Sequence, residues 1–131
     1  MSRTGTGCDR GSVSGFVVVI TMAVLACAGL VIDGARVVGA KVEAADHAEN
    51  AARAGAQEII ARDGVVTLDV PKARQRASAY LASVGAHGSV EVTPAGISVT
   101  VSESVDTTLL SLVGVDTRSV SATRSADPVT E

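Results

Sequence analysis

The sequence predicts an α+β protein: a long N-terminal helix, a second short helix and a small antiparallel sheet of about three strands. Three observations lead to this prediction. Residues 11–32 form an uncharged, mostly apolar run, and an alanine-rich helical pattern follows it without a break. Residues 90–101 then alternate between apolar and polar side chains on both sides of a turn.

The composition indicates a membrane segment and a thin core rather than a soluble enzyme. Hydrophobic residues make up 47% of the 131 residues, but aromatic residues only 2%. Enzyme cores usually contain more large rings, because each ring buries a large apolar area. The net charge of -3 is spread along the chain without a basic stripe, so we expect no nucleic-acid partner.

The uncharged run at residues 11–32 is predicted to be a transmembrane helix. About twenty apolar residues are needed to cross roughly 30 Å of hydrocarbon as a helix, and the run meets that length. A buried core helix is the alternative, but it would need a larger core than a chain of this size can supply. The small, polar residues 1–10 are expected to form a disordered cytoplasmic tail.

A cleaved signal peptide is the second alternative for the same run. Ala26-Cys27-Ala28 has the small residues of a signal-peptidase site, and residues 24–27 loosely resemble a lipoprotein signal. The product would be a secreted or lipid-anchored small ligand-binding domain. However, the apolar run continues to Ile32 and is longer than a typical signal, so we favour a retained anchor.

Residues 33–63 are predicted to continue the same helix outside the membrane. Helix formers dominate, proline is absent, and apolar positions recur every three or four residues. We expect Asp63-Gly64 to end the helix, which would then contain about fifty residues and measure about 70–75 Å at 1.5 Å per residue.

A row of alanines recurs every fourth position in this segment. Small side chains allow a second helix to approach closely, so the row is a candidate seat for a partner helix. The alternative is that alanine is simply the best helix former. The row consists of Ala40, Ala44, Ala48, Ala52 and Ala56.

Residues 64–124 are predicted to form a small α+β head, followed by a frayed tail at residues 125–131. Pro71 suits the first turn of a helix that ends at Gly85. A hairpin follows around Pro94-Ala95-Gly96, and then come a helical turn at 107–112 and a short third strand at 118–122. We expect the sheet to pack against the long helix, because a head of this size has a marginal core alone.

The titratable residues form no catalytic or metal-binding pattern in the sequence. Glu43 and His47 lie one helical turn apart, but a metal site normally needs three or four ligands. His87 lies in a predicted turn, and Cys8 and Cys27 are poorly placed for a disulfide. We therefore expect no enzyme activity, no cofactor, no metal and no small-molecule substrate.

Several stretches occur in an order that resembles the TadE/TadG-like proteins of the Flp (tight adherence) pilus system. An Arg-Gly-Ser entry precedes the apolar run, an Asp and an Arg follow it, and the helix ends in an acidic, alanine-rich stretch with a glycine. A looser similarity covers residues 107–124. The matching positions are Arg10, Gly11, Ser12, Asp33, Arg36, Glu49 and Gly55.

This resemblance implies a pilin-like arrangement and a non-enzymatic, single-pass component of pilus assembly or a related secretion apparatus. Its partners would be the lipid bilayer and other pilus-assembly or pilin-like subunits that contact the long helix. Independently of the resemblance, Lys and Arg flank the run two against two, and the much larger C-terminal domain favours a cytoplasmic N-terminus with the C-terminal domain extracellular or periplasmic. Prepilin-like members carry a glutamate five residues after the cleavage glycine, where this chain has Phe16 if Gly11 is that glycine. This difference favours the TadG-like side of the family; a membrane-tethered regulatory subunit is a further alternative.

Overall fold

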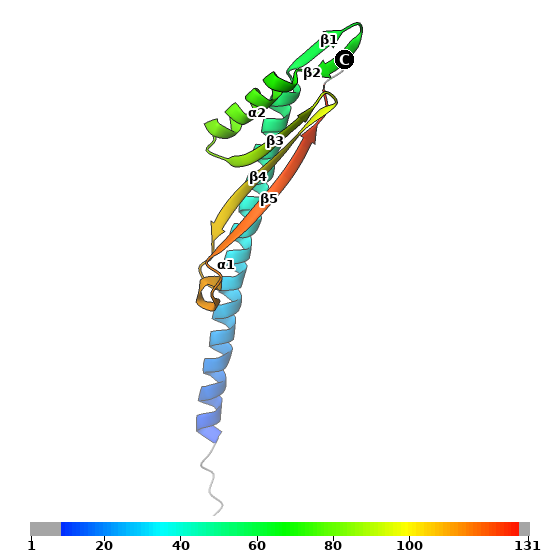
Figure 1. Cartoon of the computed structure of the whole chain (residues 1–131). Helices are drawn as coiled ribbons and strands as arrows, with labels where there is room; N and C mark the ends of the chain where they lie inside the picture. Colours follow the sequence, from blue (N-terminus) through cyan, green and yellow to red (C-terminus); the bar gives the residue numbers. More distant parts are fainter. Residues whose placement is uncertain (1–8, 129–131) are drawn as a thin grey trace, which may run out of the picture.

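The computed structural model describes residues 9–128 and confirms the α+β fold class. A long helix runs the length of the molecule, and a small head covers its C-terminal half (Figure 1). The elements in chain order are α1 (Asp9–Ala56), β1 (Ile59–Arg62), β2 (Val65–Leu68), α2 (Val70–Ser83), β3 (His87–Thr93), β4 (Gly96–Asp106), the 3-10 turn η1 (Leu110–Val113) and β5 (Thr117–Ala126).

Helix α1 contains 48 residues and has two different halves. Its N-terminal half carries large apolar side chains that none of the described residues covers, such as Phe16 at 67% and Val31 at 71% exposed. By length and composition, this helix could cross a membrane, and none of its most apolar stretch is buried within the chain. The structure therefore does not support the alternative of a buried core helix.

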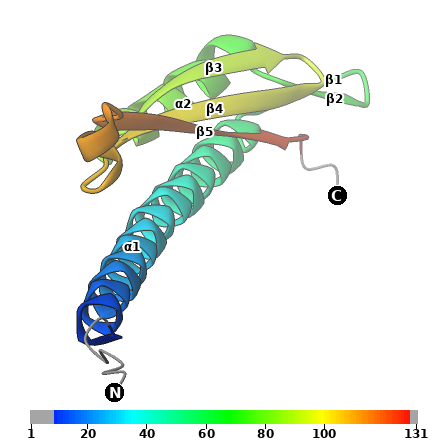
Figure 2. The ribbon, with the colours of Figure 1, turned by 90° about the horizontal axis from the view of Figure 1, so that it is seen from below.

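The C-terminal half of α1 forms the core together with a three-stranded antiparallel sheet in the order β3-β4-β5. The side chains of Ile97, Val99 and Val101 on the central strand β4 are fully buried. Because side chains alternate between the two faces of a strand, the intervening Ser98 and Thr100 lie on the other face. Figure 2 shows α1 crossing beneath the sheet. The core thus lies between one face of the sheet and the alanine-rich face of α1.

Helix α2 begins and ends as its sequence predicts. Asp69 is the N-cap, and its side chain accepts a hydrogen bond from the Lys72 N–H at 3.3 Å, with Pro71 in the first turn. Gly85 follows the helix with a positive φ of 69°. The helix adds Ala73, Ala77 and Leu81 to the buried residues.

The end of α1 was predicted wrongly. The helix ends at Ala56, and Asp63-Gly64 instead forms the turn of a two-stranded hairpin, β1–β2. Both turn residues have positive φ, 52° for Asp63 and 79° for Gly64, as a two-residue hairpin turn with matching twist requires. The β-branched residues on each side, Ile59-Ile60 and Val65-Val66, favour strands over a continued helix.

The remaining strands and the termini differ in extent from the prediction. The β3–β4 hairpin is confirmed, but β5 runs from Thr117 to Ala126 and pairs with β4 along its whole length. Ser125 and Ala126 therefore belong to the sheet rather than to a frayed tail. At the other end, Asp9 and Arg10 already lie in α1. Asp127 and Pro128 lie in no helix or strand, and residues 1–8 and 129–131 of the predicted tails lie outside the described residues.

Candidate functional site at the junction of helix and head

The β4–β5 loop, residues 107–116, contacts α1 at the end of its apolar run. Asp33, the first charged residue after that run, accepts three backbone hydrogen bonds from the loop. The donors are the N–H groups of Thr108 at 3.1 Å, Leu109 at 2.8 Å and Leu110 at 3.2 Å. In Figure 1 the turn η1 lies beside α1 at the lower end of the head.

This contact supplies hydrogen-bond partners both to the N–H groups of the loop and to the Asp33 carboxylate. The first N–H groups of a helical turn have no partner within that turn, and the carboxylate of Asp33 supplies one. In return, Asp33 is only 2% exposed, and a buried carboxylate is stable only where hydrogen bonds replace its lost water. The contact therefore fixes the loop to the helix across 75 positions of sequence.

The surroundings lower the pKa of the Asp33 carboxyl from its ordinary value of 3.8. The hydrogen bond from the backbone N–H of Thr108 has the largest effect, and burial of the carboxyl opposes it. The N–H groups of Leu109 and Leu110 and the charge of Arg36 lower the pKa further. Asp33 is thus held in its charged form.

Two more residues on the same face of α1 complete the contact. The Arg36 guanidinium donates to the Thr108 hydroxyl at 2.7 Å. At Gly29, an added Cβ would lie 1.5 Å from the Cδ1 atom of Leu109, so the loop packs directly on the glycine backbone. Gly29, Asp33 and Arg36 are four and three positions apart, which places them on one helix face.

A second close contact joins α1, α2 and the sheet at Gly55. A Cβ there would lie 2.4 Å from the Cδ1 atom of Ile97 and 2.9 Å from the carbonyl oxygen of Ala73. Since Ala73 belongs to α2 and Ile97 to β4, glycine at this position lets three elements meet.

The family-motif positions predicted from the sequence therefore divide into three groups. Asp33, Arg36 and Gly55 hold the head on α1. Glu49 instead forms an ion pair with Arg53 one turn along the same helix. The others lie in the first turns of α1: Arg10, Gly11 and Ser12. Sequence reasoning missed Gly29, although a glycine inside a helical pattern is a recognised sign of close packing.

The alanine row is covered by the head of the same chain. Four of its members are buried in the core beneath α2 and the sheet, and Ala40 is half-buried. A helix of another subunit could reach this row only by displacing the head. The seat that we expected for a partner is therefore filled by the chain itself; the buried members are Ala44, Ala48, Ala52 and Ala56.

The other candidate groups hold no arrangement that suggests chemistry. His47 Nε2 and Glu43 Oε1 lie 3.8 Å apart, and His87 is exposed at the start of β3. Within residues 9–128, no group of three or more His, Cys, Asp or Glu side chains is placed to hold a metal ion. The Cys27 thiol is free and exposed on the N-terminal half of α1. We call this half, whose large apolar side chains are exposed, the bare half of α1.

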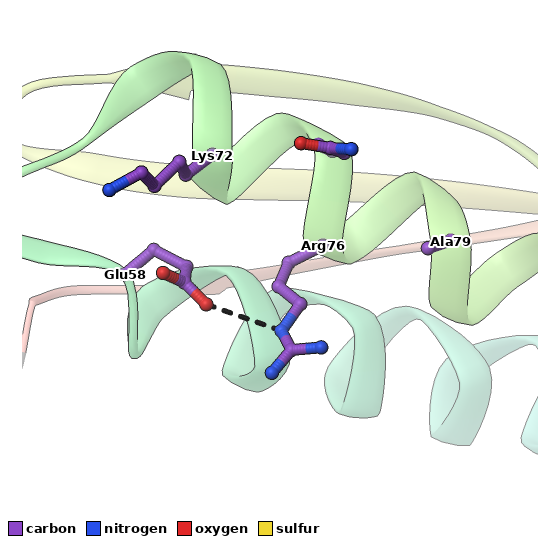
Figure 3. A pocket seen from close by; sticks show the side chains of 5 residues that line it. Glu58, Lys72, Arg76 and Ala79 are labelled. Atoms are coloured by element: carbon purple, nitrogen blue, oxygen red, sulfur yellow. Dashed lines mark hydrogen bonds and ion pairs between the residues drawn. The ribbon is translucent and has the colours of Figure 1, made fainter.

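An open groove lies between α2 and the segment that follows α1. Its lining includes Glu58, Lys72, Arg76 and Ala79. Figure 3 shows Glu58 and Arg76 facing each other, with the Arg76 Nε atom 3.2 Å from the Glu58 Oε1 atom. This ion pair ties α2 to the chain just after α1, and the open, solvated groove around it favours a structural role.

The Asp33 contact predicts a pH dependence that one substitution should remove. Because the folded-state pKa lies below the ordinary value, the contact is complete above pH 3.8 and is lost as the pH falls through the lowered pKa. Hydrogen exchange at Thr108, Leu109 and Leu110, normalised to intrinsic rates, should therefore accelerate below that value. The Asp33→Asn variant should exchange rapidly already at neutral pH and show no further pH dependence.

The matched control for this measurement is Asp46→Asn, at an exposed carboxylate on the same helix. It should leave exchange in the loop unchanged at every pH. Equal protection of the loop in the Asp33→Asn variant and the unmodified chain would contradict the role assigned to this carboxylate.

The comparison with family models connects this geometry to known proteins. Residues 11–58 match the model described as putative Flp pilus-assembly TadE/G-like, a segment that contains the bare half of α1 and the contact residues Gly29, Asp33, Arg36 and Gly55. No curated protein and no solved structure matches the chain. The resemblance predicted from the sequence is therefore confirmed over residues 11–58, where this chain is similar to Flp pilus-assembly TadE/G-like proteins.

Proposed function

We propose that the protein is a membrane-anchored, non-enzymatic component of a Flp/Tad-type pilus assembly or a related secretion apparatus. One observation carries this proposal. The segment that matches the family coincides with α1, whose apolar half the head leaves bare and whose other half supports the head.

The bare half of α1 supports a membrane location. Large apolar side chains surround the helix from Val13 to Ile32 without one charge among them. A continuous apolar surface of this size is unfavourable in water, and a helix that is apolar on all sides suits a hydrocarbon environment. Twenty residues at 1.5 Å each match a hydrocarbon thickness of about 30 Å. Asp33 then marks the membrane boundary, where the head begins.

The order of the segments favours a cytoplasmic N-terminus. Arg3 and Arg10 precede the span and Arg36 and Lys41 follow it, so the positive-inside rule gives only a slight bias, and the much larger C-terminal domain is what favours this orientation. The head would then lie on the extracellular or periplasmic side.

A role in assembly rather than catalysis follows from what the matched residues do. Asp33, Arg36 and Gly55 are used to fix the head on the helix. Since the alanine row is covered, partner subunits would contact parts of α1 that the head leaves open. Val38 at 63% and Val42 at 55% exposed offer such a surface just beyond the proposed membrane boundary.

The membrane anchor is tested with two arginine substitutions in the same helix. We expect the unmodified chain to remain in the membrane pellet after carbonate washing, with an intact mass that includes its N-terminal residues. Leu25→Arg should cost about 2.5–3.5 kcal/mol of insertion, enough to impair anchoring. Val38→Arg, beyond the proposed span, should have little effect. A mature chain that begins at Cys27 or Gly29 would instead support the cleaved-signal alternative.

The assembly role is tested by photo-crosslinking in the cells that produce the protein. A photoreactive residue at Val42 should crosslink to another Flp/Tad component, because this side chain projects from α1 away from the head. The same probe at the exposed Glu91 on β3 is the matched control and should give a weaker or different pattern. Normal abundance with no Flp/Tad component captured from either position would count against the proposed function.

A further inference from the structure

We infer that the β4–β5 loop is a second membrane contact, in which η1 presents Leu112 to the hydrocarbon edge of the leaflet where α1 ends. The inference rests on the proposed membrane anchor and adds a lipid-binding surface to it. The loop would then hold the head at a defined height and rotation on the bilayer.

The position of the loop along α1 is the first argument. Leu109 packs on Gly29, and the backbone of the next residues binds Asp33. Gly29 lies within the uncharged run, three residues, or about 4.5 Å, before its end. If residues 13–32 span the hydrocarbon, Leu109 must lie at the level where the hydrocarbon gives way to the headgroups. The loop is therefore brought to the membrane by the helix that crosses it.

The side chains of the loop are the second argument. Residues 107–115 carry no charge and include three leucines and two valines; the one charged residue of the loop, Asp116, stands at its end, next to β5. Leu112 is 79% exposed, more than Phe16 or Val31 in the bare half of α1. Burial of a leucine side chain away from water is worth about 1.5–3 kcal/mol, so an exposed leucine at this height gains from contact with lipid.

The backbone of the loop is the third argument. Irregular backbone is costly in hydrocarbon because each unpaired N–H or C=O group loses its water. Here the Asp33 carboxylate accepts hydrogen bonds from the N–H groups of residues 108–110. Further N–H groups bond within the loop: Thr107 to Asp116 O, Leu112 to Leu109 O, Gly114 to Ser111 O and Val115 to Leu110 O. Seven N–H groups between residues 107 and 115 are thus hydrogen-bonded, three to Asp33 and four within the loop, while the Leu112 side chain is exposed.

Two hydroxyl groups of the loop also form hydrogen bonds within the loop. The Thr107 hydroxyl donates to the carbonyl oxygen of Val115, and the Ser111 hydroxyl donates to that of Thr108 at 2.7 Å. The occupant that fits a surface of this kind is the lipid already proposed to surround α1. The two surfaces are continuous, because Leu109 bridges them at Gly29.

The test uses the full chain in vesicles of phosphatidylcholine and phosphatidylglycerol, with no other protein present. In a background of Cys8→Ser and Cys27→Ala, single cysteines are introduced as Leu112→Cys, Val31→Cys and Ala95→Cys and labelled with the fluorophore NBD. Lipids spin-labelled near the headgroup quench only a fluorophore at that depth. Val31 reports on the anchor, and Ala95 reports on the exposed β3–β4 turn far from η1.

We expect strong quenching of the Leu112→Cys label, comparable to that of the Val31→Cys label, and almost none of the Ala95→Cys label. Quenching at Val31→Cys alone would overturn the inference and leave the anchor intact; the loop would then face water or a protein partner. Quenching at neither position would overturn the anchor and the inference together. Equal quenching at all three positions would mean that the whole head adsorbs to lipid, which also overturns a specific loop contact.

Discussion

The head depends on the packing of one sheet face against α1. Ile97, Val99 and Val101 on β4 are buried in one core cluster with the alanines of the helix. Alanine is suited to this place, since its small side chain lets the helix and the strands come close. Helix α2 covers only part of the same face. The helix that leads into the proposed membrane span is thus also the central core element of the head.

The Asp33 contact adds a second constraint at the lower end of the head. Packing on the alanine face alone would leave the β4–β5 loop free, but three backbone hydrogen bonds and the Arg36–Thr108 bond fix it to the helix. Gly55 and Gly29 provide close contacts at the two ends of the same interface. The helix and the head are therefore joined by specific contacts at both ends of their interface. If α1 spans a bilayer as proposed, these contacts would couple the orientation of the helix to the surface that the head presents.

Much of this fold could be predicted from local patterns in the sequence. The apolar run, the α2 start at Asp69 and Pro71, and the β3–β4 hairpin each have a sign within a few residues. The β1–β2 hairpin was missed because Asp63-Gly64 is typical both of a helix end and of a two-residue hairpin turn. The β-branched residues beside it were the evidence that could have decided between them.

The tertiary contacts could not be predicted in the same way. Family resemblance identified Asp33 and Arg36 as notable residues, but their partners lie more than seventy positions away in sequence. The alanine row showed a similar limit. Its spacing indicates that a helix face is buried, but spacing carries no information on whether another subunit or the chain's own sheet covers that face.

The central claim, that the head is built on α1, is tested most directly by the stability of the Ala48→Leu variant. Ala48 is fully buried beneath the sheet, whereas Ala35 is exposed on the same helix and provides the matched change Ala35→Leu. Each full-length variant is unfolded in urea in detergent micelles and followed by pulse proteolysis. Ala48→Leu should lower the free energy of unfolding by about 1–3 kcal/mol through overpacking, while Ala35→Leu should leave it nearly unchanged. Equal unfolding midpoints for the two variants would contradict the account.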